Sequence, residues 1–131
     1  MPQISPRRTL TALALAAAAV GSLLVTAPAA QANDYLGACL DSVGYRKSPN
    51  GWNVPARNFS QGSSGVCVKE LQLDLASTIG IDEEDWPGFV DGRFGPKTDK
   101  YVRRFQQSSH LEVDGIVGPR TWESLISRTT D

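Results

Sequence analysis

The sequence predicts an all-α fold, namely a small bundle of three short helices with a disulfide-tethered, irregular N-terminal arm. Three observations lead to this expectation. An eight-residue motif that combines a turn with a helix start occurs twice, at residues 91–98 and 114–121. An apolar stripe at helical spacing runs from Val68 to Ile79. No two segments show the alternation of polar and apolar residues that a strand pair requires.

The repeated motif explains how two of the helices begin. Its copies read Asp-Gly-Arg-Phe-Gly-Pro-Lys-Thr and Asp-Gly-Ile-Val-Gly-Pro-Arg-Thr. Asp-Gly favours a turn, because glycine adopts positive φ at no steric cost. The apolar fourth residue, Phe94 or Val117, then turns inward. Pro96 or Pro119 begins a helix, where its missing N–H would have had no partner. Two copies of this length predict two repeated loop-to-helix units.

Residues 1–32 have the features of a secretory signal peptide. Arg7 and Arg8 give it a positive start, an Ala/Leu-rich apolar run follows, and Ala30-Gln31-Ala32 fits the small-x-small cleavage rule. Cleavage there would release residues 33–131 outside the cytoplasm. An uncleaved membrane anchor is the alternative, and the arginine pair leaves Sec and twin-arginine export both open.

Residues 33–61 form the expected arm. They are rich in Gly, Pro, Ser and Asn and show no helical period, so we expect irregular structure with a short extended piece at residues 52–54. The chain has two cysteines, Cys39 and Cys67. In an exported protein an even pair indicates a disulfide, which would tether the arm to the first helix. Two free, buried thiols are the alternative.

The body, residues 62–131, is expected to hold the three helices. The first ends at Gly80, a residue type that commonly follows a helix. Residues 82–85 are four consecutive acids, and we expect a solvated loop because their spacing does not suit a hard cation. The second helix begins at Pro96 and has basic outer faces, and the third begins at Pro119. The expected core consists of Leu71, Leu75, Phe94, Val102, Phe105, Leu111, Val117, Trp122 and Leu125.

Composition excludes several functional classes. The net charge is −1, and it becomes more negative once the leader arginines are removed, which argues against a nucleic-acid partner. The single histidine, His110, provides too few ligands for a zinc hydrolase once the cysteines are paired. No nucleophile turn surrounds it. We therefore expect no enzymatic activity, no metal site and no cofactor.

Further residues accompany the two motifs in a fixed order. They are Gly65, Val68, Leu71-Gln72, Leu75, Val102, Phe105-Gln106, Leu111, Trp122 and Leu125. Together with the motifs they resemble the three-helix peptidoglycan-binding domains that are attached to many cell-wall hydrolases. The resemblance covers residues 60–127. The acidic segment at residues 82–85 and the cysteine-linked arm depart from the family pattern.

This resemblance implies a secreted, non-catalytic module that binds peptidoglycan in the bacterial cell wall. It implies a monomer associated with the wall outside the cell, without nucleic acid and without stable membrane insertion after the signal is cleaved. A protein-interaction module that recruits or regulates a secreted cell-wall hydrolase is the alternative, because one fold carries different sites.

The candidate ligand site is the first loop-to-helix unit and its helix. Loop N–H groups and cations there suit the carboxylates and amides of peptidoglycan. A purely structural role for the motif is the alternative for each of its residues. The residues expected to line the site are Asp91, Arg93, Phe94, Thr98, Tyr101 and Arg104.

Overall fold

A computed structural model describes residues 35–129 of the chain. The expected signal peptide, residues 1–32, lies outside this range. The described residues belong to one structural unit. None of their helices is long and apolar enough to cross a membrane.

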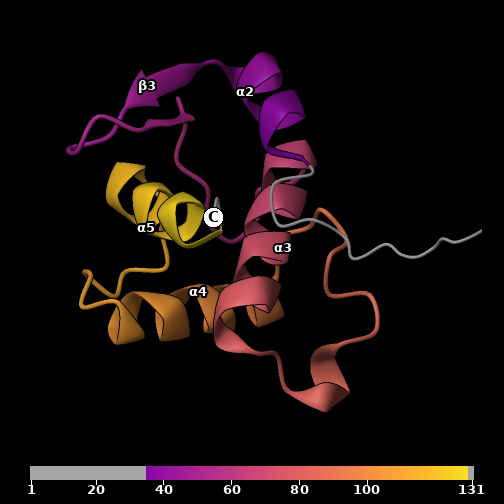
Figure 1. The fold of residues 1–131 in the computed structure, drawn as a ribbon. Coiled ribbons are helices and arrows are strands. Elements are labelled where there is room, and N and C mark those ends of the chain that lie inside the picture. The colour runs from indigo at the N-terminus through magenta and orange to yellow at the C-terminus, as the bar shows by residue number, and fades with distance from the viewer. Residues whose placement is uncertain (1–34, 130–131) are drawn as a thin grey trace, which may run out of the picture. The chain divides into compact units, whose positions relative to one another are not determined.

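The described part of the chain is mainly helical (Figure 1). The three helices expected in the body are α3 (Val66–Ile79), α4 (Pro96–Ser108) and α5 (Pro119–Thr129). A 3-10 turn, η2 (Glu83–Asp85), lies between α3 and α4. Both motif prolines occupy the first position of their helices, as the sequence predicts. The all-α expectation is therefore confirmed.

The arm is not irregular, so this part of the expectation is wrong, whereas the extended piece expected at residues 52–54 is confirmed to within one residue. It contains helix α2 (Leu36–Val43) and strands β3 (Tyr45–Lys47) and β4 (Asn53–Pro55), which pair antiparallel with Arg46 opposite Val54. Such short elements carry too few residues for a periodic pattern to stand out. A hairpin of this size is marginal in water. Packing of α2 on α3 and of β4 on α5 stabilises them instead.

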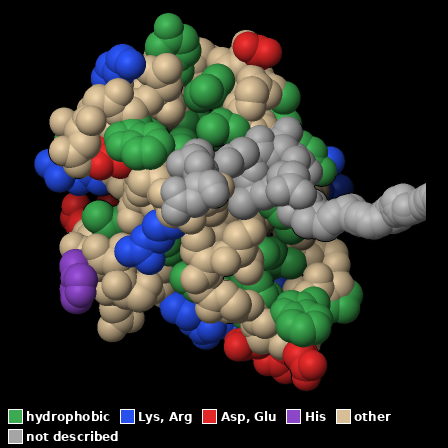
Figure 2. All heavy atoms as spheres, in the orientation of Figure 1, with side chains coloured by type: hydrophobic (Ala, Val, Ile, Leu, Met, Phe, Trp, Pro, Cys, Tyr) green, Lys and Arg blue, Asp and Glu red, His purple; other side chains and the backbone are tan. Residues whose placement is uncertain are grey.

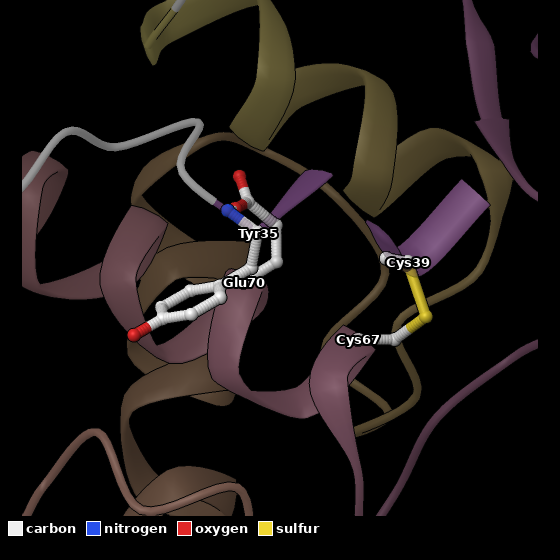
Figure 3. The surroundings of a disulfide bond; sticks show 4 residues. All are labelled: Tyr35, Cys39, Cys67 and Glu70. Carbon is white, nitrogen blue, oxygen red and sulfur yellow. A yellow bond between two sulfur atoms is a disulfide. The ribbon is translucent and has the colours of Figure 1, made fainter. Parts of the chain in front are cut away.

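The predicted disulfide between Cys39 and Cys67 is present (Figure 3). It joins α2 to the first turn of α3, and both side chains are buried. One helical turn along α3, Glu70 accepts the backbone N–H of Tyr35 at 3.1 Å. Closing a loop of this length should stabilise the fold by roughly 3–4 kcal/mol in the chain-entropy model.

The hydrophobic core is shared by the body and the arm. Leu111 is half-buried, and the other expected core residues are buried. The arm adds Cys39, Val54 and Phe59 to this cluster. The Phe59 ring meets the Trp122 ring edge to face, with centroids 6.0 Å apart. The arm is therefore part of the folded core and not an appendage to it.

A buried glutamine on α3 holds the first loop-to-helix unit. Gln72 donates from Nε2 to Asp91 Oδ1, to the Arg93 carbonyl and to Thr98 Oγ1, each at 3.0 Å. Its Oε1 accepts the Gly92 N–H at 2.8 Å. Asp91 closes the turn by accepting the Arg93 N–H at 2.8 Å. One amide therefore satisfies the polar groups of a tight loop that has few backbone partners of its own.

A second glutamine, Gln106 on α4, repeats the same contacts in the second unit. Its Nε2 donates to Asp114 Oδ1 and to the Ile116 carbonyl at 3.0 Å, and to Thr121 Oγ1 at 3.2 Å. Its Oε1 accepts the Gly115 N–H at 3.0 Å. Each helix therefore supplies a glutamine that anchors the loop leading into the next helix.

Replacing Gln106 by alanine tests this anchoring role. The change leaves the Gly115 and Asp114 N–H groups without their acceptor, so we expect the free energy of unfolding to fall by about 2–4 kcal/mol. Urea denaturation measures this loss. Gln107→Ala is the matched control, because Gln107 is exposed on the same helix. Equal stability of the two variants would contradict the anchoring role.

Helix α3 also buries two acids one turn apart, Glu70 and Asp74. Burial, reinforced by the neighbouring Glu70 carboxyl, raises the pKa of Asp74 far above its usual range. The folded chain therefore keeps a proton on Asp74 at neutral pH, whereas the unfolded chain releases it above about pH 4. Because the folded state binds more protons in this range, the free energy of unfolding decreases as pH rises.

Asp74→Asn should remove this decrease in the free energy of unfolding at high pH, because an amide has no charge to desolvate. We expect the variant to be more stable than the wild type at pH 8 and closer to it near pH 4, where about half of the unfolded wild-type chains also carry the proton. Urea midpoints measured from pH 4 to pH 8 give the comparison. Asp41→Asn on the exposed face of α2 is the control. Parallel curves for wild type and Asp74→Asn would contradict the assignment.

Candidate functional site

The structure divides the expected site residues into an interior and a surface set. Phe94 and Thr98 are 2% exposed and Tyr101 is 0% exposed, so their side chains lie in the interior. Asp91 and Arg93 are exposed on the loop. The six residues therefore do not form one continuous ligand-binding surface.

The interior residues have structural partners. Phe94 exchanges backbone hydrogen bonds with residues 56–65, the segment between β4 and α3 that we call the connector. It donates to the Ser63 carbonyl at 2.9 Å and accepts from the Gly62 N–H at 2.8 Å. Thr98 accepts from Gln72. The Tyr101 hydroxyl donates to Asp85 Oδ2 at 2.7 Å. These contacts position the loop and leave no side-chain surface for a ligand.

Asp91 is exposed, but its carboxylate serves the loop. Partial burial alone would raise its pKa, yet the Arg93 N–H and the Gln72 amide donate to it and hold the pKa below its usual range. Asp91 is therefore ionised at neutral pH. Its charge lies at the surface of the first unit, next to the Arg93 side chain.

Arg104 lies away from this loop, on the side of α4 that faces the acidic segment. Its guanidinium is 3.7 Å from Asp82 and stacks over the Tyr101 ring at 4.9 Å. Lys100 is 3.3 Å from Asp82 and 3.2 Å from Asp85. Figure 2 shows acidic side chains gathered beside basic ones near the position of η2. The expected solvated loop is confirmed for Asp82, Glu83 and Glu84, which are exposed, whereas Asp85 is buried against α4.

The geometry of η2 explains this pairing. Residues three apart lie one above the other in a 3-10 turn, so Asp82 and Asp85 face α4 together. The Lys100 ammonium holds the pKa of Asp82 below its usual range, and the Tyr101 hydroxyl followed by Lys100 does the same for Asp85. These acids in turn raise the pKa of Lys100. The cations on this part of α4 are thus largely neutralised by the chain itself.

Arg93 differs from Arg104 because it has no ion-pair partner within residues 35–129. Two shallow cavities meet at Asp91 and Arg93, with volumes of about 280 and 360 Å³. Phe89, Gly95 and Lys97 line the smaller one. Arg93 therefore forms a cationic ridge between two depressions.

Further cations lie on either side of this ridge. Lys69 lines the larger cavity, with its ammonium 5.7 Å from the centre of the Tyr35 ring. Lys97 lines the smaller cavity, and its side chain is 54% exposed with Asp85 at 3.9 Å. The first unit thus presents a row of cations, Lys69, Arg93 and Lys97. We call these three residues the cationic row.

Within residues 35–129, no group of three His, Cys, Asp or Glu side chains is placed to hold a metal ion. His110 is exposed in the turn after α4, where it adopts a φ of 59°. What the arrangement offers is a row of cations beside two cavities.

Sequence reasoning missed Lys69 and the two glutamines as parts of the unit. Gln72 lies 19 residues before the aspartate it holds, whereas Gln106 lies 8 residues before its own. Because these two separations differ, the sequence does not show that the two glutamines are equivalent. A large apolar residue followed by glutamine, in the helix before each motif, could have revealed them. These pairs are Leu71-Gln72 and Phe105-Gln106.

Comparisons with known proteins agree with this architecture. Residues 64–125 match the family described as "Putative peptidoglycan binding domain". The chain is 43% identical over 75 residues to a Kitasatospora aureofaciens protein described as an uncharacterized protein in the bpoA1 3′ region, which covers 57% of this chain and 60% of that protein. It is 38% identical over 73 residues to the zinc D-Ala-D-Ala carboxypeptidase of Streptomyces albus G, which covers 56% of this chain and 28% of the carboxypeptidase.

Among solved structures, the crystal structure of the SleB N-terminal domain superposes with a TM-score of 0.51 at 32% sequence identity. This match covers 59% of the chain and 99% of that domain. The chain spans less than two thirds of the length of the curated relatives named above. The shared region is therefore a module that these proteins have in common.

Proposed function

The chain belongs to the peptidoglycan-binding domain family, and on this basis we propose that it is a secreted, non-catalytic module that binds cell-wall peptidoglycan. The signal-peptide features of residues 1–32 support export, and the disulfide is consistent with an oxidising compartment. The shared region makes up 28% of the zinc carboxypeptidase, which supports a binding module separable from the rest of that enzyme.

The observation that carries the proposal is the position of Arg93. Its guanidinium is exposed, without an ion-pair partner in the described residues, on a ridge between two cavities. Stem peptides of peptidoglycan carry carboxylates, and a guanidinium binds a carboxylate through two parallel hydrogen bonds. Arg93 is therefore the residue best placed to contact the stem peptide.

The rest of the first unit has supporting roles in this proposal. Lys69 and Lys97 extend the positive potential into the two cavities. Asp91 holds the loop so that the Arg93 side chain faces outward. Phe94, Thr98 and Tyr101 support the loop from the interior, and the pairing of Arg104 with Asp82 removes Arg104 from the proposed contact surface.

Arg93→Ala should weaken peptidoglycan binding about ten-fold or more, because a hydrogen bond to a charged group contributes roughly 1.5–3 kcal/mol. Arg104→Ala is the matched control, since it removes the same charge from a helix face where Asp82 already neutralises it. Co-sedimentation of the disulfide-bonded chain with purified, teichoic-acid-free peptidoglycan measures both variants. Binding should also weaken with added salt.

Three outcomes separate the alternatives. Loss of binding in Arg93→Ala with retention in Arg104→Ala supports the cationic row as the site. Equal effects of the two variants would place the contact surface elsewhere on the basic faces of the molecule. A folded wild-type protein that stays in the supernatant would overturn the proposed function and favour a module that recruits or regulates a secreted hydrolase.

A further inference from the structure

The second loop-to-helix unit has a cavity of its own, with a volume of about 360 Å³. Its floor is the loop around Gly118 and Pro119, which corresponds to Gly95 and Pro96 in the first unit. The backbone of the two loops is alike because Gln106 and Gln72 hold them through the same contacts. The two cavities are therefore related by the internal repeat.

The chemistry of the two cavities differs at the residue that follows Asp-Gly. In the first unit this residue is Arg93, whereas in the second it is Ile116, whose side chain is 41% exposed. Leu111 lies beside it in the cavity wall. The second cavity thus has an apolar surface where the first has an unpaired cation.

The arm supplies the opposite wall of the second cavity. Backbone hydrogen bonds between Phe59 and Val117, at 3.2 and 2.7 Å, hold the connector against the loop. Asn58 therefore lies over Gly118, because a Cβ atom added to Gly118 would be 3.2 Å from the side-chain oxygen Oδ1 of Asn58. Arg46 Nη2 donates to this Oδ1 at 2.6 Å. The amide oxygen is thus occupied, and the amide NH2 has no acceptor within residues 35–129.

The hairpin loop that carries Pro49 completes this wall and is anchored to α5. The Asn50 backbone N–H donates to Glu123 Oε1 at 3.2 Å, and the Asn50 side chain also donates to Glu123. These donors, with Ser48, hold the pKa of Glu123 below its usual range. This wall of the cavity is therefore held at two places before any ligand binds.

The lining chemistry favours a neutral, amphipathic ligand. Pro49, Leu111 and Ile116 offer apolar surface, and Asn58 offers an amide donor. Glu112 and Asp114 bring negative charges to the lining and Arg120 a positive one. The Arg46 guanidinium bonded to Asn58 adds a second positive charge, so neither sign dominates. An N-acetylated sugar matches this set, because it combines apolar C–H faces with an acetamido carbonyl that accepts a hydrogen bond.

We propose that this cavity is a second subsite, which binds an N-acetylhexosamine of the glycan strand while the cationic row binds the stem peptide. This inference rests on the proposed function. It gives the arm a direct part in recognition, since Pro49 and Asn58 belong to segments outside the repeated units.

The connector places the two subsites within reach of one ligand. Residue 59 pairs with the second loop and residue 64 pairs with the first, through the bridges Phe59 to Val117 and Ser64 to Arg93. Five extended residues span at most about 18 Å. A sugar and its attached peptide can therefore occupy both subsites, and the second contact then forms at high effective concentration.

Two small probes separate the subsites, namely chitotetraose, which is a peptide-free N-acetylglucosamine tetramer, and a synthetic stem pentapeptide. Isothermal titration of the disulfide-bonded chain should detect both. Asn58→Ala is expected to weaken chitotetraose binding about five- to ten-fold through loss of one hydrogen-bond donor, with pentapeptide binding unchanged. Ile116→Ala should act in the same direction. Arg93→Ala should weaken pentapeptide binding and leave chitotetraose binding unchanged.

Asn53→Ala is the matched control, because Asn53 is an exposed asparagine of β4, in the same arm as Asn58, and does not line the cavity. Near-ultraviolet circular dichroism checks that each variant is folded. Chitotetraose binding that is absent in the wild type, or unaffected by both Asn58→Ala and Ile116→Ala, would overturn the second subsite. If intact peptidoglycan still sediments the chain in that case, the proposed function survives. If it does not, both proposals fail.

Discussion

The fold depends on one interaction that is made twice, the hydrogen bonding of a buried glutamine amide to the loop that begins the next helix. A loop of this kind leaves carbonyl and N–H groups that would be costly to bury without partners. Gln72 and Gln106 satisfy them from inside the bundle, so that the loop is connected to the helix that precedes it. The bundle and its loops are thereby one cooperative structure.

This interaction also decides which positions of the repeat are free to serve recognition. The aspartate, the glycine that follows it and the threonine are hydrogen-bonded to the buried glutamine, and the fourth residue of the motif fills the core. The residue after Asp-Gly, Arg93 or Ile116, is different. Its N–H donates to the motif aspartate and its carbonyl accepts from the glutamine, while its side chain faces outward. Two copies of one scaffold therefore present a cation in one unit and an apolar side chain in the other.

The segments outside the repeat modify the surface around these units. The acidic turn η2 neutralises one face of α4 through Asp82 and Asp85, whereas Arg93 on the first loop has no ion-pair partner among the described residues. The arm adds Phe59 to the core and Asn58 to the rim of the second cavity. The pairing of Phe59 with Val117 holds one end of this wall, and the hairpin contact with Glu123 holds the other.

The sequence alone determined the three body helices, their starts at Pro96 and Pro119, the disulfide and nearly all of the core, because turn chemistry and helical periodicity reside in neighbouring residues. Of the candidate site, it named the loop and Arg93, on which the proposed function rests and which stay a prediction. The structure of the arm, the glutamine anchors, the burial of Tyr101 and the pairing of Arg104 with Asp82 were decided only by tertiary structure. Several of these features depend on contacts between residues far apart in the sequence. Gln72 and Asp91 are 19 positions apart and Tyr35 and Glu70 are 35 apart, and no local pattern encodes such a pairing.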